Sequence, residues 1–433
     1  MPIVSRAGAP HRGRLRLSAA AAALACLLAA APAHAAPAVT PEAPRASRSA
    51  NPLPPQVVSA EFPSGHNGQE GAPARTTGRF TFSPGGGEDI VSYTYEFGSS
   101  EPSARVDVPP AGNSVTVEFT PGRMGPHTLY VYATDRAGNR SVTFRYLFHA
   151  ADPGLPDSPG DTTGDGYSDL YTVDDTGTVR FHRGSGPDGA VGVPVTVAEG
   201  WDGALLTRRG DWNGDSYDDL VSRRADGKLR YHPTDGLGRL ERNGEQEIHQ
   251  FYAPGEGGID PATIDQVISL GDLRPSPGLS TPDLLAVVDD VLWYLPNMGY
   301  GYLDAAQLIS ADGWSDRTIV SPGDLDSDGR TDLPARDTSD GTLWLYRGST
   351  AADGGTDPLS LADDTRRIAY GTGFTPAAHP LIAAPGDTDG DGIADLWTTA
   401  PGELRFRSGG GTSAGIPVTV GADGAWDRVR SPA

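Results

Sequence analysis

Cysteine and lysine are almost absent from this sequence. Cys26 is the single cysteine among 433 residues, and Lys228 is the only lysine. One cysteine excludes an intrachain disulfide, so bound metal becomes a plausible way of fastening loops in an exported chain. The 34 basic residues are outnumbered by 56 acidic ones, which gives a net charge of −22. This excess argues against nucleic acid and anionic membranes as partners.

Long apolar runs are also missing, except near the N-terminus. Several arginines precede an apolar run over about residues 17–31 and the small-residue site Ala33–Ala35. This order predicts a secretory signal peptide over residues 1–35, cleaved before Ala36. Cleavage at Cys26, as in a lipoprotein, is the alternative. Because the rest of the chain has no apolar stretch that could span a bilayer, we expect a secreted, extracellular protein without a membrane span.

Two segments precede the repeated part of the chain. Residues 36–54 are rich in Pro, Ala and Ser and predict a flexible linker. Over residues 55–150, seven short runs of alternating apolar residues are separated by turn residues, which predicts a β-sandwich. The turn DRAGNRS at residues 135–141 resembles the corresponding turn of bacterial immunoglobulin-like or fibronectin-like modules. We expect this segment to be a spacer or an adhesive module.

The segment 155–433 repeats one aspartate-rich motif five times. The motif is clearest in GDTDGDGIADL at residues 386–396, and the first aspartates of the five copies fall at positions 161, 211, 272, 324 and 387. Each copy is followed by a short apolar strand, a turn and further alternating strands. Four antiparallel strands per repeat are typical of a propeller blade. The C-terminal strand can pair beside the first blade, so we predict an all-β chain that ends in a closed, five-bladed β-propeller.

The motif itself predicts a calcium loop. Asp387, Asp389 and Asp391 occupy alternate positions, and a glycine and Asp395 follow. Oxygen ligands at alternate positions, with glycine at the sharp turn, suit Ca²⁺. An EF-hand would need a glutamate at the twelfth position, where this chain has Thr398. The loop is therefore a shorter kind of calcium site.

These residues resemble FG-GAP repeats of the VCBS type, the class found in integrin α-chain propellers and some fungal lectins. The resemblance rests on the pattern G-D-x-[DN]-x-D-G-x-x-D-[LIV] and covers residues 155–433, although the literal Phe-Gly…Gly-Ala-Pro core is missing. In that family, loop positions 1, 3, 5 and 9 supply side-chain oxygens and position 7 supplies a backbone carbonyl. The resemblance thus implies about four structural Ca²⁺ sites.

The ligands implied by the resemblance fall in four copies of the motif. They are Asp161, Thr163, Asp165, Tyr167 and Asp169 in copy 1; Asp211, Asn213, Asp215, Tyr217 and Asp219 in copy 2; Asp324, Asp326, Asp328, Arg330 and Asp332 in copy 4; and Asp387, Asp389, Asp391, Ile393 and Asp395 in copy 5. Copies 4 and 5 have the fullest carboxylate sets. Copy 3 has Arg274 and Ser276 at positions 3 and 5 and should bind no metal.

Three further patterns have a structural and a functional interpretation. Arg209-Gly210-Asp211 spells an adhesion tripeptide, but Asp211 is the first residue of a metal loop, so its carboxylate should face inward. His182 and His232 occupy equivalent positions in two blades and should pack at the surface. Trp201, Trp314, Phe374 and Trp426 recur before the next motif. We expect them to pack between blades; sugar stacking is the alternative.

Nucleophile elbows, paired catalytic carboxylates and zinc motifs are missing from the sequence. Their absence favours a binding protein over an enzyme. We expect a monomeric bacterial protein that binds an extracellular glycan or protein partner, with adhesion as one such role. An extracellular hydrolase or lyase with its site in the propeller cavity is the first alternative, since fold does not decide function. A purely structural spacer is the second.

Overall fold

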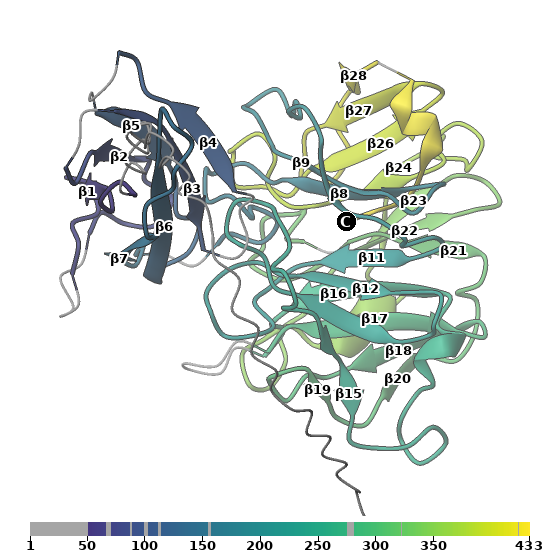
Figure 1. Ribbon diagram of the computed structural model, residues 1–433. Helices are drawn as coiled ribbons and strands as arrows, with labels where there is room; N and C mark the ends of the chain where they lie inside the picture. Colours follow the sequence, from purple (N-terminus) through teal and green to yellow (C-terminus); the bar gives the residue numbers. More distant parts are fainter. Residues whose placement is uncertain are drawn as a thin grey trace, which may run out of the picture. The chain divides into compact units, whose positions relative to one another are not determined.

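The computed structural model describes part of the chain, in which Ala50–Ala433 forms one compact unit. The described ranges are 51–65, 71–86, 89–98, 103–110, 114–154, 157–274, 281–321, 323–422 and 424–433. The predicted signal peptide and most of the predicted linker, residues 36–54, lie outside them. The described part is all-β, with antiparallel sheets and three short 3₁₀ turns (Figure 1). Within these ranges, none of the helices has the length and apolar character needed to cross a membrane.

The first region consists of two antiparallel sheets. One contains β1 (Gln56–Val58), β2 (Gly78–Ser83) and β5 (Val115–Phe119), and the other contains β4 (Ala104–Asp107), β3 (Ile90–Phe97), β6 (Gly125–Asp135) and β7 (Phe144–Ala150). Each of the seven alternating runs in the sequence contains one of these strands. Alternate side chains point into one cluster of buried residues shared by both sheets, in which Phe80, Phe97 and Phe148 are in ring contact.

The second region contains five four-stranded antiparallel sheets, which we number in chain order. Sheet 1 contains β8 (Leu170–Asp174), β9 (Val179–His182), β10 (Val195–Ala198) and β29 (Val429–Pro432); sheet 2 contains β11 (Leu205–Arg208), β12 (Leu220–Arg223), β13 (Leu229–His232) and β14 (Gln246–Glu247); sheet 3 contains β16 (Gln266–Gly271), β17 (Asp283–Val288), β18 (Val291–Leu295) and β20 (Gln307–Ser310); sheet 4 contains β21 (Arg317–Ile319), β22 (Leu333–Asp337), β23 (Leu343–Tyr346) and β24 (Ile368–Gly371); and sheet 5 contains β25 (Ile382–Ala383), β26 (Leu396–Ala400), β27 (Glu403–Arg407) and β28 (Val418–Gly421).

The aspartate-rich motifs occupy the same place in every sheet. In sheets 2 to 5 the motif joins the first strand to the second. In sheet 1 the motif precedes β8, and the first position is filled by the C-terminal strand β29, which pairs with β8. The backbone N–H of Ala433 also donates to the carbonyl of Tyr171 at 2.8 Å. The C-terminus accordingly lies beside β8 (Figure 1).

Apolar clusters fill the boundaries between successive sheets, which we call seams. Each of five clusters combines side chains of two neighbouring sheets, and the cluster between sheets 5 and 1 contains Leu170, Leu404 and Phe406. Two short strands, β15 (His249–Gln250) and β19 (Tyr302–Leu303), pair in parallel and connect the loops of sheets 2 and 3. The core of this region is therefore divided among the seams instead of lying within one pair of sheets.

Candidate metal loops and seam cavities

The first aspartate of each complete motif organises its own loop. In copy 5 the Asp387 carboxylate accepts backbone N–H groups from Gly390 at 2.7 Å, Asp391 at 3.2 Å and Gly392 at 2.8 Å. Asp161, Asp211 and Asp324 accept equivalent bonds in their loops. Loop positions 4 and 6 have left-handed backbone in all four copies, which explains the glycines usually found there.

Two of these left-handed positions carry a side chain. Ser327 stands at position 4 of copy 4 with φ 60°, and Ser216 stands at position 6 of copy 2 with φ 73°. The glycines at the equivalent positions of copy 5, Gly390 and Gly392, have φ 83° and 90°. Because a Cβ atom disfavours this conformation, each serine strains its loop.

The aspartate at position 9 is fully buried and links the loop to the third strand of its sheet. Asp395 accepts the N–H of Thr388 at 2.7 Å within the loop and the N–H of Gly409, beyond β27, at 2.7 Å. Asp169, Asp219 and Asp332 bond in the same way to residues 184, 234 and 348. Burial raises the pKa of Asp332 and of Asp395 to about 7. A nearby cation would offset this desolvation of the charged carboxylate.

Copies 4 and 5 bring three carboxylates together. Oxygen atoms of Asp324, Asp326 and Asp332 lie within 4.8 Å of one another, as do oxygen atoms of the second set, Asp387, Asp389 and Asp395. Both sets combine two partly exposed carboxylates with one buried carboxylate. Hard oxygen donors in this arrangement fit a divalent cation such as Ca²⁺. Among the described residues, these two clusters are therefore candidate metal centres.

The remaining predicted ligands lie at the same loops. Asp165, Asp215, Asp328 and Asp391 occupy position 5, and each accepts the N–H of its position-7 residue, which is Tyr167, Tyr217, Arg330 and Ile393 in turn, at 2.9–3.1 Å. In copy 1 the Thr163 hydroxyl lies 3.5 Å from Asp161. In copy 2 the Asn213 amide donates to Asp215 at 2.9 Å. Copies 1 and 2 therefore keep the loop fold, and their metal ligation stays a prediction.

Arginines pair with carboxylates in three of the loops, a feature that sequence reasoning missed. Arg183 follows β9 and donates to Asp165 at 2.7 Å, and Arg347 at the equivalent place after β23 pairs with Asp326. In sheet 2 this place is taken by Pro233, which has no donor. There Arg123, from the loop between β5 and β6 of the first region, pairs with Asp215. In copies 1 and 4 the sequence signal is an arginine one residue beyond the third strand.

The same first-region loop contacts copy 2 through a ring as well. The Tyr217 hydroxyl accepts the N–H of Met124 at 2.9 Å, and the guanidinium carbons of Arg75 and Arg123 lie 4.9 and 5.7 Å from the Tyr217 ring centroid. Arg75 also pairs with the buried Asp157 at 2.6 Å. Copy 2 is thus both a candidate metal loop and a docking point for the first region.

In copy 3 the last aspartate of the motif is Asp283, three residues later than position 9 of the other copies. Asp283 accepts the N–H of Asn297 and the hydroxyl of Tyr294, both at 2.8 Å, so it keeps the bond to the residues beyond the third strand. The guanidinium of Arg274 lies 5.5 Å from the Tyr294 ring centroid. Burial raises the pKa of Asp283 to about 6. This copy retains the structural aspartate, while Arg274 supplies positive charge nearby.

The recurring aromatic residues are buried in the seams, as the packing interpretation expects. Trp426, in the 3₁₀ turn Ala425–Arg428 between β28 and β29, lies against His182 of sheet 1 with ring centroids 5.0 Å apart, and Trp201, between β10 and β11, lies against His232 of sheet 2 at 4.6 Å. The two histidines bond equivalent hydroxyls, those of Thr172 and Ser222. Both histidine side chains are buried, so our expectation of surface packing was wrong: these tryptophans cover them. Trp314 and Phe374 are buried in the same way.

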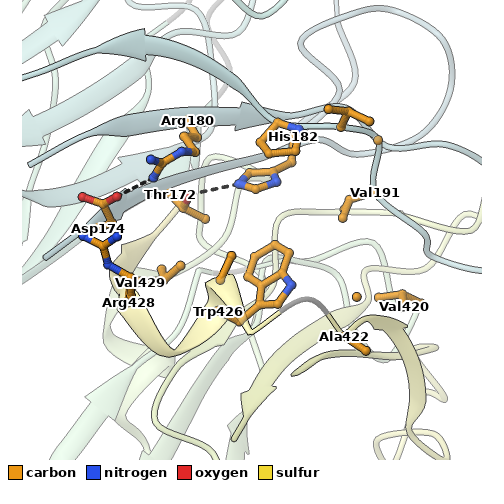
Figure 2. Close-up of a pocket in the computed structure, with 15 residues that line it drawn as sticks. Thr172, Asp174, Arg180, His182, Val191, Val420, Ala422, Trp426, Arg428 and Val429 are labelled. Carbon is orange, nitrogen blue, oxygen red and sulfur yellow. Dashed lines mark hydrogen bonds and ion pairs between the residues drawn. The ribbon is translucent and has the colours of Figure 1, made fainter. Parts of the chain in front are cut away.

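Two seams contain a cavity beside this tryptophan–histidine pair. The cavity between sheets 5 and 1 has a volume of about 450 Å³, and Figure 2 shows Trp426 and His182 facing it together with Arg180 and Asp174. Although burial alone would raise it, hydrogen bonds from Thr176 and Arg180 lower the pKa of Asp174 below its ordinary value. The equivalent cavity at Trp201 and His232 has a volume of about 590 Å³.

The tripeptide Arg209-Gly210-Asp211 lies in a candidate metal loop, and its aspartate is hydrogen-bonded within that loop. The carboxylate of Asp211 accepts backbone N–H groups from Gly214 at 2.6 Å and Ser216 at 2.7 Å. The inward orientation predicted for this carboxylate is confirmed. In the structure the tripeptide is part of a loop and does not present a free carboxylate to a partner.

Comparison with known proteins adds little to this geometry. The chain matches no protein-family model and no curated protein. One solved structure with detectable likeness is a mutant Tc holotoxin pore of Photorhabdus luminescens, with 15% sequence identity and a TM-score of 0.28. The match covers 80% of this chain and spans 16% of the toxin chain.

Proposed function

We propose that sheets 1 to 5 are the blades of a closed FG-GAP/VCBS-type β-propeller, preceded by an immunoglobulin-like β-sandwich at residues 55–150. The seam between the last and first sheets repeats an internal contact, which supports closure. The Trp397 indole donates to the carbonyl of Gly189 at 3.0 Å, and at the equivalent place the Tyr171 hydroxyl donates to Gly238 at 2.9 Å. With β29 completing sheet 1, the ring has no unpaired edge at this seam.

The ion proposed for the loops is Ca²⁺, with Asp324, Asp326 and Asp332 holding one ion and the equivalent residues of copy 5 holding another. Bound calcium would neutralise carboxylates that otherwise repel one another, and so stabilise the connection between the first two strands of a sheet. Copies 1 and 2 would add weaker sites. They lack the three-carboxylate cluster of copies 4 and 5. A cation has to compete with Arg183 or Arg123 for their position-5 carboxylate, and with Arg347 for Asp326 in copy 4.

Calorimetric titration of the full chain with CaCl₂ tests the metal assignment. We expect dissociation constants of roughly 10⁻⁴–10⁻³ M, the range of extracellular calcium modules. Asp389→Asn should weaken one site, and Asp326→Asn should weaken another. The exposed Asp202→Asn is the control and should leave the titration unchanged. A flat wild-type titration would remove calcium from the proposal.

The function that we propose is that of an exported binding module whose ligand enters a seam cavity. The observation that carries it is the pair of equivalent cavities at Trp426 and Trp201, whose volumes lie in the range of small-ligand pockets. Each cavity combines an aromatic wall with a few polar groups. A glycan is the ligand class with matching chemistry. The carboxylates beside them are paired with arginines, Asp174 with Arg180 for example, so nothing at these cavities favours the hydrolase or lyase alternative.

A glycan array probed with the calcium-loaded chain tests this function. Val193 lines the first cavity and is 89% exposed, so Val193→Trp should obstruct the cavity without disturbing the core. Ile416 is 88% exposed but does not line the cavity, which makes Ile416→Trp the matched control. We expect glycan binding by the wild type and by the control, and reduced binding by Val193→Trp. An array without signal would contradict the glycan assignment.

A further inference from the structure

A group of exposed aromatic side chains lies away from the seam cavities. The paired strands β15 and β19 (Figure 1) bring the rings of Phe251 and His249 into contact with the Tyr302 ring, with centroids 5.4 and 5.6 Å away. Tyr252 and Tyr300 flank this stack in the sequence. The exposed fractions are 61% for Phe251, 45% for Tyr252, 70% for Tyr300 and 44% for Tyr302. We call these five residues the aromatic platform.

The backbone under the platform is strained where it presents Tyr300. This residue has φ 52°, and it stands between Gly299 with φ 101° and Gly301 with φ 75°. Left-handed backbone is costly for a residue that carries a Cβ atom and a ring. Glycine adopts this backbone conformation with less strain, and both neighbours of Tyr300 are glycines. Such strain at an exposed aromatic residue motivates the hypothesis that its side chain binds a partner.

The charged residues of the platform's own two segments are negative. The two segments that form it, 249–256 and 298–304, contain Glu256 and Asp304 and have neither arginine nor lysine. The whole chain, these residues included, has a net charge of −22. Such a field attracts cations and repels polyanions. A ring face also attracts a cation through its quadrupole, so the rings and the carboxylates favour the same kind of partner.

At other places in the chain, arginine guanidinium groups lie over aromatic rings. Arg367 lies over Trp344 at 4.2 Å, Arg224 over Trp201 at 4.9 Å and Arg140 over Tyr132 at 5.0 Å. Among the cation–ring contacts of the described residues, none involves the platform. The platform is thus an aromatic surface for which the described part of the chain supplies no guanidinium.

We propose that the aromatic platform is the docking surface for a basic segment of another polypeptide, whose arginine or lysine side chains pack against the exposed parts of the Tyr302 and Phe251 rings. This inference rests on the proposed role as a binding module and adds a partner class to it. It depends on neither the metal loops nor the seam cavities. A neutral glycan is the competing occupant, and the experiment separates the two.

The test measures binding of a fluorescent oligo-arginine peptide to the full chain by fluorescence anisotropy at physiological ionic strength. The double variant F251L/Y302L keeps apolar bulk and net charge but removes the quadrupoles. We expect its affinity for the peptide to fall roughly tenfold, the size expected for losing two exposed cation–ring contacts. Tyr130→Leu removes an exposed ring from β6 and should leave the affinity unchanged.

Two results would overturn the proposal. If F251L/Y302L binds the peptide as tightly as the wild type, the net charge alone attracts it. If a neutral gluco-oligosaccharide binds the platform and the peptide does not, the occupant is a glycan. The titrations are run both in calcium and in chelator, and the ratio of wild-type to variant affinity should be the same in both. Failure of the calcium proposal therefore leaves this test intact.

Tyr300→Gly provides a second readout that a purely structural role would not give. Relief of the left-handed strain should raise the melting temperature, whereas loss of the ring should weaken peptide binding by about threefold. A rise in melting temperature with unchanged peptide affinity would count against the assignment of this strain to docking.

Discussion

The two regions of this chain solve the problem of burying a core in different ways. The first region places its aromatic side chains in one cluster between two sheets. In this cluster the ring of Phe80 contacts the rings of Phe62, Phe97 and Phe148. The repeat region divides its apolar side chains among five seams and also buries the position-9 aspartate of each complete motif, such as Asp332 and Asp395. One region is held by a single apolar core, and the other by many small cores together with buried carboxylates.

This difference predicts which region loses stability when the pH or the metal concentration changes. Burial of apolar surface depends weakly on pH and on metal ions, whereas a buried carboxylate or imidazole depends on what neutralises or solvates it. The repeat region should therefore respond to chelators and acid, and the first region should respond to changes of side-chain volume. Four predictions test this contrast, from the largest expected effect to the smallest.

The largest effect should come from Phe80→Ala in the first region. Phe80 is completely buried, and its removal leaves a cavity between the two sheets. We expect a loss of about 3–5 kcal/mol in the free energy of unfolding. Urea denaturation followed by near-ultraviolet circular dichroism measures it. The loss should be equal in calcium and in chelator; a calcium-dependent loss would break the contrast between the regions.

Removal of calcium should act on the repeat region. At a calcium concentration about ten times the dissociation constant, each site that only the folded state binds contributes about 1.4 kcal/mol. Excess chelator should therefore lower the melting temperature markedly, and Asp395→Asn should reduce that shift. Differential scanning calorimetry measures both. A wild-type melting temperature that is insensitive to the chelator would contradict occupied loops.

Acid should also act on the repeat region, through His232. Burial first, and then Arg224 and Arg230, lower the pKa of this histidine to about 3. Glu245 is 3.8 Å away, but it already pairs with Arg224 and Arg230, and the ring otherwise faces Ser222 and Trp201. The unfolded chain takes up a proton near the ordinary pKa of 6.5, and the folded chain does not.

The stability contributed by neutral His232 is therefore complete above pH 6.5 and is lost as the pH falls toward about 3. The slope is at most about 1.4 kcal/mol per pH unit, or about 2 kcal/mol at pH 5. His232→Gln should flatten the stability profile between pH 6.5 and 5, measured by urea denaturation. Identical slopes in variant and wild type would exclude this histidine as the cause.

The smallest effect should come from the strained serines of the loops. Ser327→Gly should raise the free energy of unfolding by about 0.5–1 kcal/mol, because glycine adopts the left-handed conformation without a Cβ penalty. Ser413→Gly is the control, since this exposed serine does not have positive φ, and it should be neutral or slightly destabilising. A stabilisation of equal size in the control would show that strain is not the reason.

Much of this architecture is visible in the sequence because it is local. The seven alternating runs at residues 55–150 all contain strands, and the motif at Asp211, Asp324 and Asp387 predicts both the loop and the strand after it. The backbone bonds of a position-1 aspartate reach only five residues along the chain. A short window of sequence is enough to predict such features.

Features that depend on residues far apart in the chain could not be predicted in this way. Arg123 and Asp215 are separated by many residues, and neither segment indicates the other. The aromatic platform was missed for the same reason: His249 and Tyr302 meet only because β15 and β19 pair in parallel. The burial of His182 depends likewise on Trp426, which is far away in the sequence.

The sequence by itself determined the all-β class, the repeat and the loops that can bind a cation, because periodicity and carboxylate spacing act within a few residues. Only the tertiary structure decided that β29 completes the first sheet, which aromatic rings are buried in seams and which remain exposed, and which arginines reach the loops. Those outcomes depend on contacts between distant segments. Such contacts form only when the whole chain has folded.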